Sequence, residues 1–160
     1  MGVRRRRTAA ARGRRTARLS GLLLHILARG KIGRSPEAEL VERYLKRIAW
    51  PTRVTELGER APVPAAASNS ISIALDERGT ALSSAELARK LESWREAGKR
   101  EARFLIGGAD GHDDTQRSSA DLLMSFGPAT WPHLLVRAML AEQLFRATSI
   151  LANHPYHREG

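Results

Sequence analysis

Apolar and polar positions follow two different periods along this chain. Continuous apolar runs at 21–28, 71–75 and 104–106 are typical of strands buried on both faces. Between these runs, apolar residues recur every three or four positions, which predicts amphipathic helices. Strands that alternate with helices indicate an α/β fold with a mostly parallel sheet flanked by helices.

Two helices carry clear start signals. Ser35 and Pro36 suit the N-cap and the first helical position, and helical spacing then continues up to Pro51. Ser83 and Glu86 form a capping box in front of a second amphipathic segment. Both helices are therefore predicted with defined first residues.

The connecting segments are less regular. Residues 52–57 alternate as a short strand, and residues 58–69, rich in Pro and Ala, are predicted to be a loop. The third strand is expected to end at Asp76. Residues 115–125 are expected to be helical, and residues 125–132 to be a short broken strand.

A long helix is predicted for residues 133–152. Its polar positions form one narrow stripe, and most of the remaining circumference is apolar. Such a helix must bury two sides, and a partner subunit is the expected second surface. The stripe consists of Glu142, Arg146, Ser149 and Asn153.

The net charge of +10 is concentrated at one end of the chain. Eight of the 27 basic residues lie within residues 1–20, and no acidic residue precedes Glu37. This basic N-terminal arm is either a disordered electrostatic tether to RNA or the product of a start codon assigned too far upstream. The remainder, 21–160, is predicted to be one domain.

Composition narrows the classes of function. The chain has no cysteine, which excludes thiolate catalysis and cysteine-ligated zinc. No apolar run reaches the length of a membrane helix, and the arm lacks the apolar core of a secretory signal. A cytoplasmic protein without a membrane partner is therefore expected.

Three segments at the carboxyl ends of strands compete for a ligand pocket: Leu75–Asp76, 107–111 and 127–132. Gly107 and Gly108 would let the backbone approach a ligand closely, although a plain tight turn explains them equally well. Their spacing excludes a dinucleotide-binding fingerprint. Trp131 either stacks on a base or belongs to the core.

Several polar side chains have a functional and a structural interpretation. The tail residues Asn153, His154, Tyr156, His157 and Arg158 could contact phosphate, stack on an unpaired base and move a proton, or could simply fray. For Arg137 the alternative is a surface salt bridge. His25 is expected to be a core histidine, and His112, Asp113 and Asp114 a helix cap rather than a metal site.

Read together, the segments ISIALDERG, LIGGADG, the loop ending in TWPH, LLVRAMLAEQLFRATSI and NHPYHRE resemble the RlmH family of SPOUT methyltransferases over about residues 22–160. The resemblance implies a trefoil-knotted α/β domain, a homodimer, and S-adenosyl-L-methionine bound in the knot. It also implies methylation of N3 of a pseudouridine in 23S rRNA, on the assembled ribosome. The arm before Leu22 and the loop at 58–69, where many relatives have a helix, depart from the family.

By motif match, the cofactor side comprises Leu75, Gly107, Gly108, Gly127, Pro128, Ala129, Thr130, Trp131 and Pro132. The substrate side comprises Asp76, Arg137, His154, Tyr156, His157 and Arg158. We expect Arg137 and Arg158 to orient the substrate and contact phosphate, and Tyr156 to stack. Proton removal falls to His154, His157 or Asp76, and no metal is required.

Two alternatives remain open at this point. The chain could be a non-catalytic RNA-binding or ribosome-binding module on a knotted scaffold, which would not need a cofactor pocket. It could also be a knotted methyltransferase that acts on transfer RNA. The nearly neutral charge of residues 19–160 argues mildly against an enzyme that binds RNA without a second ribosomal component.

Overall fold

The computed structural model describes residues 21–153 and Tyr156. The basic arm at 1–20 and the tail residues His154, His157 and Arg158 lie outside these described residues.

The five described strands form one parallel sheet in the order β2-β1-β4-β3-β5. This sheet confirms the predicted α/β fold with a parallel sheet. The trefoil knot that the resemblance implies stays a prediction. The strands are β1 (Leu23–Arg29), β2 (Thr52–Leu57), β3 (Ser70–Ala81), β4 (Glu101–Ile106) and β5 (Leu122–Ser125).

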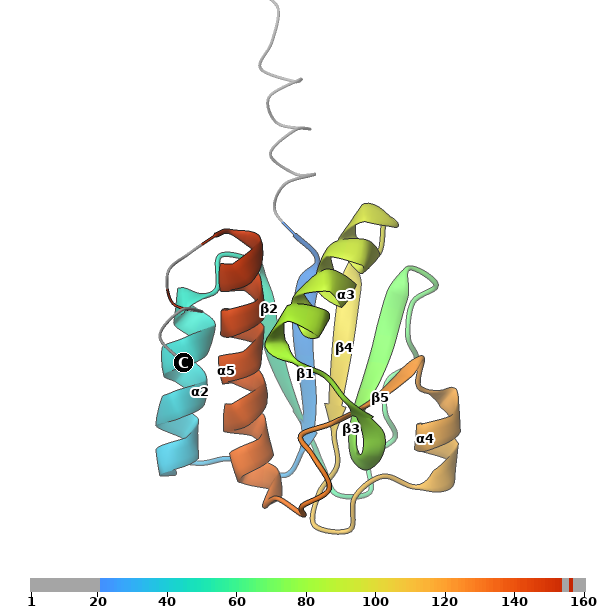
Figure 1. Cartoon of the computed structure of the whole chain (residues 1–160). Helices are drawn as coiled ribbons and strands as arrows, with labels where there is room; N and C mark the ends of the chain where they lie inside the picture. Colours follow the sequence, from blue (N-terminus) through green and yellow to red (C-terminus); the bar gives the residue numbers. More distant parts are fainter. Residues whose placement is uncertain (1–20, 154–155, 157–160) are drawn as a thin grey trace, which may run out of the picture.

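Three helices, α2 (Pro36–Arg47), α3 (Ser84–Glu96) and α5 (His133–Leu151), cover one face of the sheet, while the short α4 (Asp114–Ser119) lies near the β5 edge (Figure 1). The predicted start signals are confirmed. Ser35 accepts a hydrogen bond from the Ala38 amide, and Ser83 and Glu86 form the reciprocal capping box.

Alternate strand positions feed two apolar layers. The larger one lies under the three helices and includes Ile26, Phe104 and Leu140. The smaller one, on the opposite face, consists of Leu27, Ala74 and Leu105 with partly buried neighbours. Both faces of the sheet are thus buried, as the continuous apolar runs predicted.

Residues 58–69 form a loop, as predicted, and this loop is fastened to the second face of the sheet. Arg29 donates hydrogen bonds to the carbonyl oxygens of Gly58 (2.8 Å) and Ala61 (2.7 Å). Arg103, which is buried, donates to the carbonyl oxygen of Pro64 at 2.6 Å. Val63 packs against the smaller apolar layer. Side chains of the sheet therefore fasten this loop to it. The loop stands where a helix was expected from the family resemblance.

The expectation that the third strand ends at Asp76 is wrong. β3 pairs with β5 at Leu75, makes an irregular excursion, and pairs again with β5 at Thr80. A Cβ atom on Gly79 would lie 2.5 Å from the backbone of Leu123, so only glycine fits beside β5. Apolar periodicity missed this second half because the excursion itself is polar.

The expected helix over 115–125 is also wrong in its second half, because α4 ends at Ser119 and β5 begins at Leu122. Asp121 causes the change. Its carboxylate accepts a hydrogen bond from the Ser72 amide, and its own amide donates to the Ser72 carbonyl, both at 2.8 Å. These bonds clamp the chain onto β3. Beyond Ser125 the segment 126–132 is a loop and not the broken strand expected.

α5 is a single helix, as predicted, but its second apolar side is covered within the chain. Leu140 and Leu144 pack on the sheet layer, whereas Ala138 and Ala141 pack on α2. Ser149, assigned to the polar stripe, is buried and donates to the carbonyl of Phe145 at 2.7 Å. The homodimer therefore stays a prediction. None of the helices in the described part is long and apolar enough to cross a membrane.

Candidate functional site

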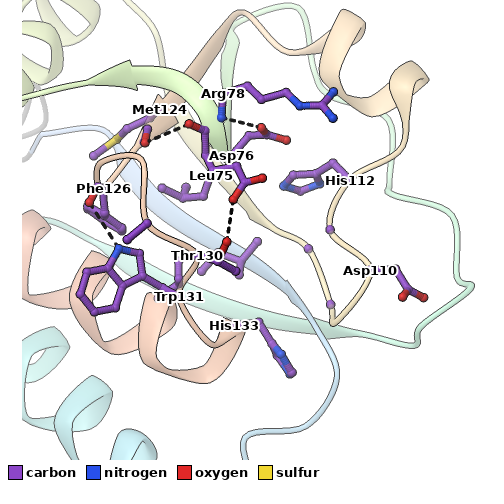
Figure 2. Close-up of a pocket in the computed structure, with 18 of the residues that line it drawn as sticks. Leu75, Asp76, Arg78, Asp110, His112, Met124, Phe126, Thr130, Trp131 and His133 are labelled. Atoms are coloured by element: carbon purple, nitrogen blue, oxygen red, sulfur yellow. Dashed lines mark hydrogen bonds between the residues drawn. The ribbon is translucent and has the colours of Figure 1, made fainter.

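The three segments that competed for a pocket line one and the same pocket, of about 280 Å³, at the irregular excursion of β3 and the carboxyl ends of β4 and β5. Figure 2 shows Leu75 and Asp76 between two walls, with His112 and Asp110 on one side and Phe126, Thr130 and Trp131 on the other. Seven of the nine residues expected on the cofactor side line it. They are Leu75, Gly107, Gly108, Gly127, Ala129, Thr130 and Trp131.

One wall is a turn built of glycines. The Gly111 amide donates to the Gly108 carbonyl at 3.0 Å, and a Cβ atom on Gly107 would lie 2.7 Å from the Gly111 carbonyl carbon. The tight turn is therefore confirmed, and it forms part of the pocket wall, whereas the close approach of a ligand to these glycines stays a prediction.

The opposite wall is the loop before α5. Gly127 has φ of 101°, and its amide donates to Ser125 Oγ at 3.0 Å, while Ser125 Oγ donates back to the Gly127 carbonyl at 2.7 Å. Pro132 is the N-cap of α5, and neither it nor Pro128 lines the pocket. The two prolines thus restrict the backbone of the loop without lining the pocket themselves.

Trp131 does not belong to the core, because 42% of its surface is exposed at the mouth of the pocket. Its indole Nε1 donates to the Phe126 carbonyl at 3.4 Å, a long bond that joins the two ends of the loop. The core alternative for this side chain is wrong. Its exposed ring face is available for stacking.

Asp76 lies at the back of the pocket with both carboxylate oxygens engaged. Oδ2 accepts from Arg117 Nε at 2.8 Å, and Oδ1 accepts from the Arg78 amide at 2.9 Å. Burial of Asp76 raises its pKa, but the hydrogen bonds from Arg117 and Arg78 outweigh this, and the pKa lies below its ordinary value. Asp76 is therefore a weak base, which argues against proton removal by this group.

Arg137 lies outside the pocket lining, one turn into α5. Its side chain is 1% exposed, donates to Glu56 Oε2 at 2.6 Å and to the Gly30 carbonyl at 3.2 Å. The salt bridge that was the alternative for Arg137 is therefore present, but its arginine is buried while Glu56 remains 36% exposed. The hydrogen bond from Arg137 holds the pKa of Glu56 below its ordinary value.

Tyr156 packs back along α5 and is not among the residues that line the pocket. Its ring lies 4.4 Å from that of Phe145, and its hydroxyl donates to Glu142 at 3.2 Å. Burial, with the neighbouring Tyr44 and Glu142, raises its pKa to about 12. In the conformation described, Tyr156 therefore belongs to the packing of α5 and not to the pocket of its own chain.

His25 and His112 make hydrogen bonds within the fold. Asp113 caps α4 as predicted, and His112 is buried, with Nε2 3.1 Å from the Leu105 carbonyl. His25 is also buried, with Nε2 2.7 Å from Thr55 Oγ1. Among the residues that the structure describes, no group of three or more His, Asp or Glu side chains is arranged to hold a metal ion.

Several lining residues carried no signal in the sequence. Glu77 and Arg78 follow a strand that was expected to end, and Arg117 lies on a short polar helix with no buried residue. His133 belongs to the quoted TWPH motif and opens α5 at the mouth of the pocket. Only the excursion of β3 and its contact with α4 bring these side chains together.

Comparison with known proteins defines the class first. The family model described as "Predicted SPOUT methyltransferase" matches residues 22–157. A Novosphingobium aromaticivorans protein named "Ribosomal RNA large subunit methyltransferase H" is 64% identical over 141 residues, which cover 87% of this chain and 100% of the relative. A Rhizorhabdus wittichii protein of the same name is 63% identical over 140 residues, with the same coverage. The chain belongs to the SPOUT methyltransferase family and, within it, to the RlmH family that its motifs resemble.

Solved structures agree in fold. A probable methylase family protein from Haemophilus influenzae has a TM-score of 0.53 at 12% identity, covering 82% of this chain and 66% of that chain. A probable methyltransferase from Bordetella pertussis has a TM-score of 0.51 at 12% identity, covering 85% of this chain and 99% of that chain. At such identity these similarities support the architecture alone.

Proposed function

We propose that this methyltransferase uses S-adenosyl-L-methionine to methylate N3 of a pseudouridine in 23S rRNA, acting on the assembled ribosome in the cytoplasm. The observation that carries the proposal is a glycine-walled pocket at the excursion of β3 and the carboxyl ends of β4 and β5, in a chain 64% identical to a relative named for the large-subunit ribosomal RNA.

The pocket suits a flat, positively charged cofactor. Gly127 has no atom within 4 Å of the position its Cβ would take, so a ligand can approach the backbone closely there, and the carboxylates of Glu77 and Asp110 line the same space. These carboxylates would attract the cationic groups of S-adenosylmethionine. When bound, this cofactor supplies an electrophilic methyl group on its sulfonium.

The substrate side requires a second copy of the chain. Tyr156 is held against Phe145 and Glu142 of α5 and does not line the pocket, so it cannot complete the site of its own chain without rearrangement. In a homodimer, the tail of the partner subunit could approach the mouth of the pocket near Trp131. We therefore propose that the tail residues His154, Tyr156, His157 and Arg158 act on the pocket of the partner subunit.

The roles on the substrate side follow from this arrangement. Asp76 orients the target base by accepting hydrogen bonds, since its low pKa makes it a poor proton acceptor. Phosphate contact falls to Arg158 and proton removal to His154 or His157. In the conformation described, Arg137 serves the site indirectly, by fixing the first turns of α5.

The test is methyl transfer from labelled S-adenosylmethionine to intact ribosomes, isolated 23S rRNA and transfer RNA, all from cells lacking this protein. Label on ribosomes that maps to N3 of a single pseudouridine is expected. Label on transfer RNA alone would show that transfer RNA, and not 23S rRNA, is the substrate. Cofactor binding without label on any RNA would overturn the proposed substrate. No cofactor binding would favour a non-catalytic binding module.

A further inference from the structure

Arg117 joins two parts of the pocket that are distant in sequence. It lies on α4, and its Nε donates to Asp76 Oδ2 at 2.8 Å, across 41 residues of chain. Its NH1 group donates to Asp114 at 2.9 Å. Asp114 is 98% exposed, whereas the Asp76 side chain is only 7% exposed. Of the two carboxylates, Asp76 is the one shielded from water and therefore the one that most needs the cation.

The helix that carries Arg117 has little else to hold it. α4 buries none of its own residues, so apolar packing does not fix its position against β3. The ion pair with Asp76 and the Asp121 clamp that follows the helix are its hydrogen-bonded links to β3. The position of α4 and the orientation of Asp76 are thus coupled.

The excursion of β3 is held from its other side as well. Thr130 Oγ1, on the loop before α5, donates to Glu77 Oε2 at 3.0 Å. Arg117 on α4 and Thr130 on the loop before α5 therefore hold the neighbouring residues Asp76 and Glu77 to two different elements. A carboxylate offers about four lone-pair directions, so Asp76 can still accept bonds from a ligand after its two present bonds.

We propose that Arg117 is a positioning residue. It holds the Asp76 carboxylate in the orientation in which that carboxylate contacts the target base in the pocket, and Arg117 itself touches neither cofactor nor substrate. This inference rests on the proposed function for its effect on turnover, but the geometry it claims exists without substrate. A misplaced contact near the reacting atoms lowers turnover by about 100-fold per ångström in unfavourable cases.

The experiment compares R117Q, R117K, D76N and the double variant D76N/R117Q, with D114N as the matched control that breaks only the exposed ion pair. Turnover on ribosomes, S-adenosylhomocysteine affinity and hydrogen exchange of the peptide over 76–81 are measured for each. R117Q is expected to lower kcat by about 10- to 100-fold with cofactor affinity retained, and to accelerate exchange. R117K should recover part of kcat, and D114N should match the wild type.

The double variant separates positioning from an independent role. If Arg117 acts through Asp76, D76N/R117Q loses no more turnover than D76N alone, within about twofold. Multiplied losses, or an R117Q variant with wild-type turnover and exchange, would overturn the proposal. If the wild type methylates none of the three RNAs, the proposed function fails, and the exchange rates of R117Q against D114N still decide whether Arg117 holds Asp76.

Discussion

Two arginine–carboxylate pairs, one with its carboxylate on β2 and one with its carboxylate on β3, are built in opposite ways. In the pair on β2, the Arg137 side chain is 1% exposed and that of Glu56 is 36% exposed. In the pair at the β3 excursion, the carboxylate of Asp76 is the buried member, and Arg117 is the more exposed one. The first pair neutralises a cation inside the fold under α5. The second presents an anion to a pocket, which marks it as part of the site.

The largest expected effect comes from breaking the first pair. E56Q leaves Arg137 buried without its carboxylate, and we expect a loss of about 3 kcal/mol in the free energy of unfolding, the low end for a buried pair because Glu56 is partly exposed. Urea denaturation measures this. E42Q, which breaks the exposed pair of α2 with Lys46, is the control and should be indistinguishable from the wild type. Equal midpoints for E56Q and E42Q would remove the distinction.

The next effect tests the backbone that places Asp76. G79A would force a Cβ atom to 2.5 Å from the Leu123 backbone, and we expect a loss of about 2 kcal/mol from overpacking, together with weaker cofactor binding. In G58A the new Cβ would make an ordinary 3.7 Å contact with Ala61, so G58A should unfold like the wild type. If G79A is as stable as G58A, the close approach of β3 and β5 is wrong.

A smaller effect is expected in how the free energy of unfolding depends on pH in the acid range. The pKa values of Asp76 and Glu56 both lie below their ordinary values of 3.8 and 4.5. A lowered pKa in the folded state contributes stability that is present above the unfolded value and is lost as the pH falls through the folded value. Unfolding free energy should therefore decrease below about pH 4.5, and less steeply in E56Q and R117Q than in the wild type. Parallel curves for all three proteins would contradict these ion pairs.

The smallest expected change in stability is at Trp131. Because 42% of this side chain is exposed, W131A should cost less than about 1 kcal/mol in unfolding free energy. It should nevertheless weaken ligand binding at the pocket mouth, which W131F would largely restore through its ring face. A strongly destabilised W131A would return this residue to the core.

Much of the fold followed from local patterns because those patterns reflect local physics. The caps at Ser35 and Ser83 and the doubly buried run in β1 were predictable from their own neighbours. The second half of β3 and the start of β5 were not, since Gly79 and Asp121 act through partners more than forty residues away. A contact at that distance leaves no periodicity in the sequence.

The site divides in the same way. Motif resemblance identified eight of the 21 residues that line the pocket, among them Leu75, Gly127 and Trp131. It missed Arg117, which lies on a helix without apolar pattern, and it placed Arg137 beside a pocket that its side chain does not line. Which member of an ion pair is buried depends on tertiary packing, and only the structure supplies that information.

The most direct measurement is the rate of methyl transfer to ribosomes from cells lacking this protein, by the wild type, D114N and R117Q. The account predicts label from the wild type and from D114N at comparable rates, and a rate about 10- to 100-fold lower from R117Q. Equal rates for wild type and R117Q, or no label from any of the three, would contradict it.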